Sequence, residues 1–393
     1  MKKLVIVGAG FAGFWAAMSA ARKMQKNNHQ ETIDITVINK EDYHTIRPRL
    51  YEASLQGITV PLNKYFDPLN IKLVIGEVVD INIEEATVSL LGNDTKIAYD
   101  ALIMATGSRL KKPNLSGVDN AFNVDTLQAA RELDSHLGQL GESGFSDKAA
   151  CHFVVVGGGF TGIEIATSLP ERLKKLSNDR INYQLSLVDQ GTDIALNYSA
   201  EGRDYILNKI KQYGIELILN DSIECIESER LFLRSGKIID TKTVILASGF
   251  QANSLTTDLP FHKDDMGRME TNSYLQSTMV PSIFVAGDLA KVKVDQENFA
   301  LMSCQHAMAQ GKQVGGNAVN YLFDESMSAY AQPNYVTCLD LGENDALFTM
   351  GWDRQVQKTG NEAKSLKSQI VQQWIYPADD VEKTLLMSDP EFG

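Results

Sequence analysis

The stretch from Lys3 to Asn39 limits what this chain can fold into more than any other. It reads as a β-branched strand, a turn with glycines at 8, 10 and 13, an alanine-rich helix and a second apolar strand. In such a turn Gly8 permits the bend, Gly10 lets a pyrophosphate approach the backbone, and Gly13 lets helix and strand pack closely. The free N–H groups at the helix start then face the phosphates. The stretch therefore predicts a Rossmann-type dinucleotide-binding unit.

The N-terminus also fits a second interpretation. Met1, Lys2 and Lys3 precede the uncharged stretch Leu4–Ala21, an arrangement that is typical of a secretory signal peptide. A signal peptide has no need of glycines at this spacing, and no matching strand would follow it. We therefore expect Leu4–Ala21 to be the first strand and helix of the fold. No other uncharged apolar stretch is long enough to span a bilayer.

The same plan starts again about 150 residues later. A strand at His152–Val156 enters a second glycine turn, and a helix at Thr161–Leu176 and a strand at Tyr183–Asp189 follow. Matching positions are offset by 157 − 8 = 149 and 189 − 39 = 150 residues. Each unit continues with a predicted hairpin and a strand that ends in A-T-G or A-S-G. These segments are Thr87–Leu91 with Thr95–Tyr99, Asp100–Gly107, Leu231–Leu233 with Lys237–Asp240, and Thr243–Gly249. The pattern predicts an internal duplication of a whole dinucleotide-binding unit.

The remaining segments connect or follow the two units. Lys111–Gly141 is polar and reads as a mostly helical connection. After the second unit, Ser282–Ala286 reads as a strand and Met302–Phe323 as a long amphipathic helix. Tyr335–Met350 alternates like a hairpin, and Glu362–Tyr376 reads as a helix stopped by a proline. We expect the last, acidic residues to be loosely ordered.

Charge and cysteine usage exclude several classes of protein. The net charge is 37 − 50 = −13, which makes nucleic acid or an anionic membrane surface a poor partner. The cysteines at 151, 225, 304 and 338 form no C-x-x-C pair, so nothing predicts a redox dithiol or a metal site. Isolated thiols suit a reducing cytoplasm.

In the order of these motifs the chain resembles the FAD/NAD(P)-dependent pyridine nucleotide oxidoreductases, over nearly its whole length. The order is G-x-G-x-x-G, A-T-G, G-x-G-x-x-G, A-S-G and then G-D at Gly287-Asp288. The resemblance implies an α/β fold of two Rossmann-like domains, with the NAD domain inserted into the FAD domain, plus a small C-terminal α+β region. The implied boundaries are 1–115 and 253–325 for the FAD domain, 116–252 for the NAD(H) domain and 326–393 for the C-terminal region.

Within this family the chain is most similar to the type II NADH dehydrogenases. The matching pieces are Asp42-Tyr43-His44, Pro48, Leu50-Tyr51-Glu52, Gly158–Glu164, Gln305 and Gln310-Gly311. Two departures weaken the prediction of quinone as acceptor. Cys304–Gly311 replaces one glutamine of the A-Q-x-x-x-Q-Q-G pattern and adds a histidine, and the long membrane-binding C-terminal helices look absent. A third departure is Asn39, which stands where an acidic residue is expected, although its amide can still bond a ribose hydroxyl.

Several side chains are candidates for chemistry. Asp189, at a strand end, is placed to accept hydrogen bonds from the adenosine ribose and to repel the 2′-phosphate of NADPH; the alternative is a surface acid. Glu164 is either a first-turn acid favoured by the helix dipole or, as the resemblance implies, a carboxylate facing the cleft between nicotinamide and flavin. Gln305 and His306 are candidates for a substrate-side role, against packing or capping.

The resemblance implies further cofactor contacts. Asp288 would bond a flavin ribityl hydroxyl, and the helix that starts near Met302 would point its positive end at the flavin N1–C2=O edge. Arg47 and Arg49 could meet FAD phosphates or an anionic substrate, or be solvated loop charges. The full cofactor-binding prediction is Gly8, Gly10, Phe11, Ala12, Gly13, Asn39, Lys40, Arg47, Pro48, Val79, Ala105, Thr106, Gly107, Gly157, Gly159, Phe160, Thr161, Gly162, Glu164, Asp189, Ser248, Gly249, Gly287, Asp288 and Gln305.

These observations predict a flavoenzyme that passes hydride from NADH to FAD and electrons on to a quinone-like acceptor. The alternatives are a reductase of a small redox protein such as ferredoxin or rubredoxin, and a redox-sensing flavoprotein that binds NADH. A sulfide:quinone oxidoreductase is disfavoured because it needs paired cysteines by the flavin. We expect a cytoplasmic protein, with weak peripheral contact at the inner face of the membrane and a homodimer left open.

Overall fold

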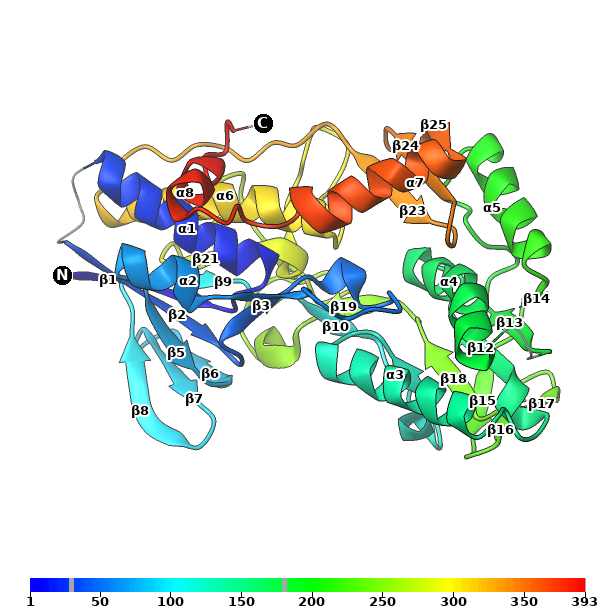
Figure 1. Cartoon of the computed structure of the whole chain (residues 1–393). Coiled ribbons are helices and arrows are strands. Elements are labelled where there is room, and N and C mark those ends of the chain that lie inside the picture. Colours follow the sequence, from blue (N-terminus) through cyan, green and yellow to red (C-terminus); the bar gives the residue numbers. More distant parts are fainter. Residues whose placement is uncertain (28–31, 179–181, 393) are drawn as a thin grey trace.

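Two parallel sheets of the Rossmann type organise the molecule, which we describe from a computed structural model over residues 1–27, 32–178 and 182–392 (Figure 1). The first sheet has the strand order β21-β9-β1-β2-β5, and every neighbouring pair in it is parallel. Its strands are β1 (Lys2–Val7), β2 (Ile33–Asn39), β5 (Lys72–Ile75), β9 (Ala101–Met104) and β21 (Ile283–Val285). Because β21 comes after the whole second sheet in sequence, the first unit is interrupted, as the sequence predicted.

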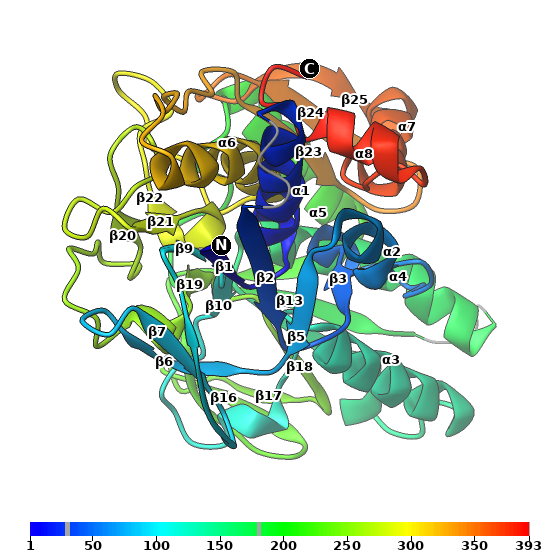
Figure 2. The ribbon, with the colours of Figure 1, turned by 90° about the vertical axis from the view of Figure 1, so that its left-hand side faces the viewer.

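One face of this sheet is covered by two helices that touch along their length (Figure 2). They are α1 (Phe11–Lys26) and α6 (Cys304–Leu322), and they come from opposite ends of the chain. A Cβ atom on Gly315 would lie 2.1 Å from the carbonyl oxygen of Ala16, so the two backbones are in direct contact there. This close approach brings the starts of both helices to the same end of the sheet.

The second sheet repeats the plan, with the order β11-β18-β12-β13-β14 and parallel pairing throughout. It lies beside the first sheet in Figure 1. Its elements are β11 (Phe122–Asn123), β12 (His152–Val156), β13 (Gln184–Val188), β14 (Ile215–Ile218) and β18 (Thr243–Leu246), with α3 (Leu127–Glu142), α4 (Phe160–Ser177) and α5 (Ala200–Gln212) packed around it. The predicted duplication is therefore confirmed.

Both predicted hairpins exist, and each has gained a third strand. The sheets are β6 (Val78–Asn82), β7 (Thr87–Leu90) and β8 (Asn93–Ala98) in the first unit, and β15 (Ile223–Ile226), β16 (Arg230–Leu233) and β17 (Ile238–Asp240) in the second. Short pairs complete the connections. They are β3 (Tyr43–Thr45) with β4 (Thr59–Pro61), β10 (Ser108–Leu110) with β19 (Phe250–Ala252), and β20 (Met269–Glu270) with β22 (Ala290–Lys291); α2 (Asn63–Phe66) is a single turn.

The connection at Lys111–Gly141 was predicted to be mostly helical, but only its second half is a helix. Its first part contains a short 3₁₀ turn and β11, which pairs with β18 of the second sheet, and the helix α3 begins at Leu127. Thr126 caps that helix by accepting a hydrogen bond from the Ala129 N–H at 3.1 Å. The strand β11 has only two residues, which is too short to show the alternation of apolar and polar residues that identifies a strand.

The C-terminal region departs most from the sequence prediction. The hairpin of β23 (Val336–Asp340) and β24 (Ala346–Met350) is present, and a polar third strand, β25 (Gln355–Thr359), joins it. The helix predicted at Glu362–Tyr376 begins and ends two residues earlier, because α7 (Gly360–Gln369) continues directly into a π-helical turn over Ile370–Trp374.

The prediction of loosely ordered last residues was wrong. They form α8 (Val381–Met387), which Asp380 caps and which buries Thr384 and Leu385 against α1. In Figure 1 this region runs from the second unit back to the first and so bridges both. No helix of the described ranges is long and apolar enough to cross a membrane.

Candidate active site

A large cavity of about 2370 Å³ opens between the two units. Both glycine turns, the start of α6 and the C-terminal region line it. Sites for one drug-sized ligand are about 300–1,000 Å³, so this cleft has room for two dinucleotides and more. The predicted site residues that line it are Gly8, Gly10, Phe11, Ala12, Asn39, Arg47, Pro48, Ala105, Thr106, Gly107, Gly157, Gly159, Phe160, Thr161, Glu164, Asp189, Ser248, Gly249, Gly287, Asp288 and Gln305.

The first glycine turn has the geometry that a phosphate cradle needs. Gly8 has φ +97°, and a Cβ on it would lie 2.4 Å from the Ala105 carbonyl oxygen. A Cβ on Gly13 would lie 1.8 Å from the Gly8 carbonyl oxygen, which shows how closely α1 packs on the turn. Gly10, at the N-cap of α1, has nothing within 4 Å of its Cβ position. The backbone there is open to a ligand in the cleft.

The second glycine turn repeats this geometry residue by residue. Gly157 has φ +111°, with a Cβ position 2.2 Å from the Ala247 carbonyl oxygen, and a Cβ on Gly162 would lie 1.8 Å from the Gly157 carbonyl oxygen. Gly159, at the N-cap of α4, is open in the same way as its counterpart. Gly13 and Gly162 therefore support the two turns from beneath rather than line the cleft.

The side chain at the end of the second strand holds the glycine turn in each unit. The Asn39 Oδ1 atom accepts from the Ala9 N–H at 2.9 Å. The Asp189 carboxylate accepts from the N–H groups of Gly158, at 2.6 Å, and Gly191, at 2.7 Å. An amide therefore suffices for this duty in the first unit. Both side chains also line the cleft, where the sequence predicted their ribose contacts.

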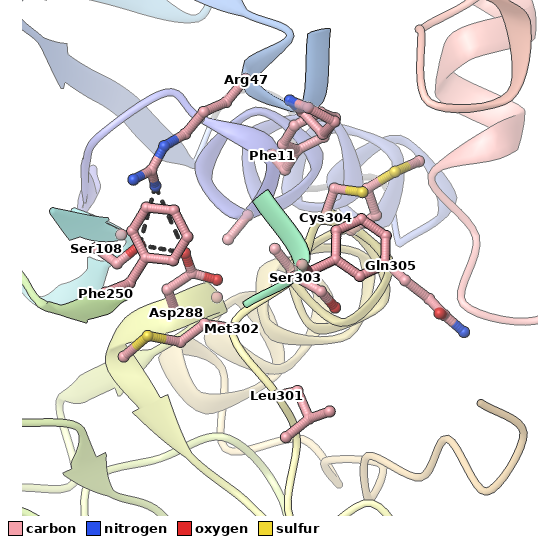
Figure 3. Close-up of a pocket in the computed structure, with 18 of the residues that line it drawn as sticks. Phe11, Arg47, Ser108, Phe250, Asp288, Leu301, Met302, Ser303, Cys304 and Gln305 are labelled. Atoms are coloured by element: carbon pink, nitrogen blue, oxygen red, sulfur yellow. Dashed lines mark hydrogen bonds and ion pairs between the residues drawn. The ribbon is translucent and has the colours of Figure 1, made fainter. Parts of the chain in front are cut away.

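A polar cluster forms around Arg47 in the cleft wall, with Ser108, Phe250 and Asp288 beside it (Figure 3). Arg47 forms an ion pair with Asp125, donates to the Ser108 hydroxyl at 2.9 Å and lies 3.7 Å from Asp288. Its guanidinium lies 4.6 Å from the centre of the Phe250 ring. Burial raises the pKa of Asp288, and the hydrogen bond from Ser108, at 2.6 Å, partly offsets this. Arg47 thus faces the cleft in a fixed position.

Arg49, the second arginine of that loop, has other partners. It pairs with Glu52 at 2.8 Å and donates to the Tyr376 hydroxyl at 2.7 Å. It is absent from the lining of the cleft. Two other predicted contacts also lie outside: Lys40 pairs with Glu77 at the surface, and Val79 stands on β6 with its side chain 48% exposed. These two residues belong to the outer edge of the first unit, away from the glycine turns.

The start of α6 faces the cleft. Ser303 caps the helix by accepting from the His306 N–H at 3.3 Å, and residues 301–305 line the cavity (Figure 3). The Gln310 side chain accepts from the Gly287 N–H at 2.7 Å, which ties the G-D turn to this helix. Burial raises the pKa of the Cys304 thiol to about 11, so this cysteine is a neutral thiol at pH 7.

His306 lies behind the lining rather than in it. It is buried and stacks with Tyr335 and Trp352, at ring distances of 5.7 and 6.0 Å. Its Nδ1 atom lies 3.1 Å from the Gln332 amide oxygen, and burial lowers the pKa of the imidazole. The structure thus gives His306 the packing role that was the alternative in the sequence, while Gln305 does line the cleft.

Glu164 is buried in the cleft wall and paired with a residue that the sequence did not single out. It is the fifth residue of α4, so the interpretation as a first-turn acid was wrong. Its carboxylate accepts from Lys367 Nζ at 2.7 Å and from the Asp340 N–H at 3.1 Å. Burial raises its pKa to about 7, although Lys367 pulls in the opposite direction. This carboxyl can therefore gain or lose a proton near neutral pH.

Lys367 belongs to a small ionic network that fastens α7 to the second unit. A second lysine of the helix, Lys364, binds both carboxylate oxygens of Asp340 at 2.8 Å, and the Tyr51 hydroxyl donates to the same carboxylate at 2.8 Å. Lys367 also donates to a backbone carbonyl of β23. No signal in the sequence could have paired positions 164 and 367, because 203 residues separate them.

Comparison with known proteins now identifies the family. The model of the pyridine nucleotide-disulphide oxidoreductases matches residues 2–311. The chain belongs to this family. As a member it is an NAD(P)H-dependent oxidoreductase, which agrees with the two glycine turns that open into one cleft.

Several relatives are similar to the chain over nearly its whole length. An NADH dehydrogenase-like protein of Mycobacterium tuberculosis is 36% identical over 381 residues, which are 96% of this chain and 95% of that protein. The type II NADH:quinone oxidoreductase of Staphylococcus haemolyticus is 26% identical over 391 residues and 94% of each chain. Among solved structures, NDH2 from Plasmodium falciparum superposes with a TM-score of 0.80 at 15% identity, covering 98% of this chain and 97% of the other.

Proposed function

We propose that this protein is an NADH dehydrogenase in which the first unit holds FAD and the second holds NADH, with a quinone-like molecule as the final acceptor. The observation that carries the proposal is the one cleft into which both phosphate cradles and the start of α6 open. The names of the relatives support NADH as donor and quinone as acceptor. The balanced reaction is NADH + H⁺ + quinone → NAD⁺ + quinol.

The residues of the two cradles fit dinucleotides. Gly10 and Gly159 leave the backbone at two helix starts open, where partial positive charge favours phosphate. Asp288 and Arg47 also line the cleft, 3.7 Å apart, and there an acceptor and a donor of hydrogen bonds can orient a polar ring system and its chain. FAD would supply the hydride and electron transfer chemistry there. The protein would supply position and charge.

Glu164 and Lys367 are the groups suited to handle the proton of the reaction. Reduction of a quinone consumes two protons, one more than the hydride of NADH brings. A carboxyl with a pKa of about 7 can release a proton from its Oε atom to a ligand in the cleft and take it back from water. Lys367 fixes the orientation of that carboxyl and its ammonium favours the ionised form afterwards.

Steady-state oxidation of NADH by the purified holoprotein tests this function. We expect a yellow protein that releases FAD on denaturation and that turns over with quinones faster than with ferricyanide, oxygen or ferredoxin. Recovery of FMN, or of no flavin from fresh holoprotein, would contradict the proposal. Preferential turnover with ferredoxin would indicate a redox-protein reductase instead, and slow turnover with every acceptor would indicate a sensor.

Nucleotide preference gives a second prediction. We expect NADH to be used in preference to NADPH, because the Asp189 carboxylate would meet the 2′-phosphate. Asp189→Asn keeps an acceptor for the Gly158 N–H and removes the negative charge. We therefore expect a small fall in kcat/KM for NADH, and a larger fall in the ratio of kcat/KM for NADH to kcat/KM for NADPH. Kinetics with both nucleotides measure this. Glu201→Gln, in the first turn of α5 and outside the cleft lining, is the control. A wild type that prefers NADPH would show that Asp189 does not bind the ribose.

The finer assignments remain predictions. They are the four domain limits given above, the cytoplasmic location, a peripheral contact with the membrane and the homodimer. The site roles are proposals that rest on the positions of the residues in the cleft.

A further inference from the structure

Arg354 is a buried cation that has no carboxylate partner within residues 1–27, 32–178 and 182–392. It lies in the turn between β24 and β25 and is 9% exposed. Its guanidinium lies 4.7 Å from the centre of the Tyr198 ring and 5.7 Å from that of Tyr335. The neighbouring carboxylate, Asp353, accepts from the Gln355 amide instead. Arg354 is therefore held between aromatic faces, without a counter-ion.

The hydrogen-bond partners of Arg354 are all neutral. Its Nη2 atom donates to the Tyr335 hydroxyl at 3.3 Å. With the amide oriented to present its oxygen, Asn197 accepts from both terminal guanidinium nitrogens at 3.0 Å. Arginine cannot escape the cost of burial by losing its proton, as a lysine or a carboxyl can. A buried unpaired charge is unfavourable, so the site is completed when an anion approaches it.

This positive charge faces the cleft. Arg354 lines the cavity together with Tyr335, which directly precedes β23, Thr337 of β23 and Lys367 of α7. In the same wall, Lys367 is paired with Glu164. Within the described residues Arg354 has no such partner, so it stands beside this pair as an unbalanced positive charge, in a chain whose net charge is −13.

We infer that Arg354 binds an anionic group of the electron acceptor, and that the acceptor is therefore a quinone-like molecule that carries a carboxylate, sulfonate or phosphate. The planar guanidinium offers two parallel N–H donors to such a group. NADH is a second source of the same chemistry. Its phosphates would lie at the glycine turn before α4, whereas Arg354 belongs to the turn between β24 and β25 of the C-terminal region. The inference rests on the proposed function, because it specifies the acceptor class for that cleft.

The test compares a charged and a neutral acceptor of the same ring system, 1,4-naphthoquinone-2-sulfonate and 1,4-naphthoquinone, in the holoenzyme. We expect Arg354→Gln to raise KM for the sulfonate by about tenfold or more, as for loss of a charged hydrogen bond, and to leave KM for the neutral quinone and for NADH nearly unchanged. Arg354→Lys should restore part of the affinity. Arg230→Gln is the matched control, because Arg230 is an exposed arginine of β16 paired with Asp240.

Other outcomes overturn the inference in distinguishable ways. An equal effect on both quinones would make Arg354 a structural residue. A rise in KM for NADH alone would place the phosphates of NADH on Arg354. FAD content and the thermal midpoint show whether a variant has folded. If Arg354→Gln does not fold, Arg354→Lys is used for the comparison instead.

Failure of the proposed function leaves the anion site testable. If wild-type enzyme reduces neither quinone, calorimetry with the redox-inert naphthalene-2-sulfonate decides the question. Binding that wild type shows and Arg354→Gln loses supports the anion site, and absence of binding to wild type overturns it.

Discussion

Lys367→Met is expected to destabilise the protein by about 3–5 kcal/mol at alkaline pH, the usual cost of leaving one member of a buried ion pair alone. The remaining member is Glu164, which is buried and, within the described residues, has one further hydrogen bond, from the Asp340 N–H. Its pKa is already raised from 4.5 to about 7 by burial, and removal of Lys367 raises it further. The Lys367→Met enzyme therefore holds a protonated, uncharged carboxyl at neutral pH.

The sign of the pH dependence follows from this raised pKa. Below the ordinary pKa of a glutamate, the Glu164 carboxyl is protonated in both the folded and the unfolded chain. The variant is then not destabilised by a buried charge. Above that value the Glu164 carboxyl ionises readily in the unfolded chain, whereas in the folded chain it ionises only at higher pH. The free energy of unfolding therefore decreases as pH rises through the folded pKa. Denaturant unfolding at about pH 6 and pH 9 measures the difference. An equal penalty at both values would contradict the argument.

The same pair gives an expected kinetic effect. Glu164→Gln keeps the shape and removes the proton donor, so we expect reduction or reoxidation of the flavin to slow by more than tenfold, which is about 1.4 kcal/mol in the barrier. Adding Glu164→Gln to Lys367→Met should also restore stability at high pH, because no buried charge remains. Glu171→Gln, at the surface of the same helix and paired with Lys175, is the control. Wild-type rates in both half-reactions would leave Glu164 with a structural role.

Gly315→Ala is expected to have the second large effect, because it disturbs the packing of α1 against α6. The new methyl group would lie 2.1 Å from the Ala16 carbonyl oxygen and 2.9 Å from the Ala20 nitrogen. Both neighbours are backbone atoms, so no side-chain rotation relieves the overlap, and α1 and α6 must move apart. Overpacking costs about 1–3 kcal/mol, and we expect the upper end or more here. FAD retention should fall too, because both helices start at the proposed flavin site.

The control stands one residue further along the same helix. Gly316→Ala places its methyl group 3.7 Å from the Ser19 hydroxyl oxygen, an ordinary contact. Alanine favours a helix over glycine by about 0.8–1.0 kcal/mol, so this variant should be as stable as wild type or more so. Thermal unfolding and FAD content of the two variants provide the measurement. Equal midpoints would show that the helices can separate at no cost.

The sequence predicted those turns and strands that are determined by residues close to one another in the chain. Gly8, Gly10 and Gly13 identify a turn by their spacing alone, and the second copy 149 residues later confirmed the assignment. Strands such as His152–Val156 are apolar runs in a buried parallel sheet, which needs no knowledge of their partners. The family and the fold therefore followed from local signals, and the cleft followed from the fold.

The features that could not be predicted from the sequence depend on contacts between residues far apart in the chain. Lys367 looks like any exposed lysine of a polar helix until α7 packs on β23 and brings it to Glu164. The strand β25 has only exposed and half-buried residues, so its sequence is polar and does not show the apolar alternation of a buried strand. The helix α8 buries few residues, and its acidic surroundings concealed them.

The interrupted first sheet has a consequence for the order in which the chain can fold during synthesis. Leu102 of β9 pairs with Ile283 of β21, so this sheet remains unfinished until β21, which lies in the last third of the chain, has left the ribosome. The second sheet draws its strands from one continuous segment, Phe122–Leu246, and can close earlier. The N-terminal unit is thus expected to be the later one to fold, against the usual order of translation. Its edge at β9 stays open in the nascent chain, and a stable flavin site can form only once α6 has also emerged.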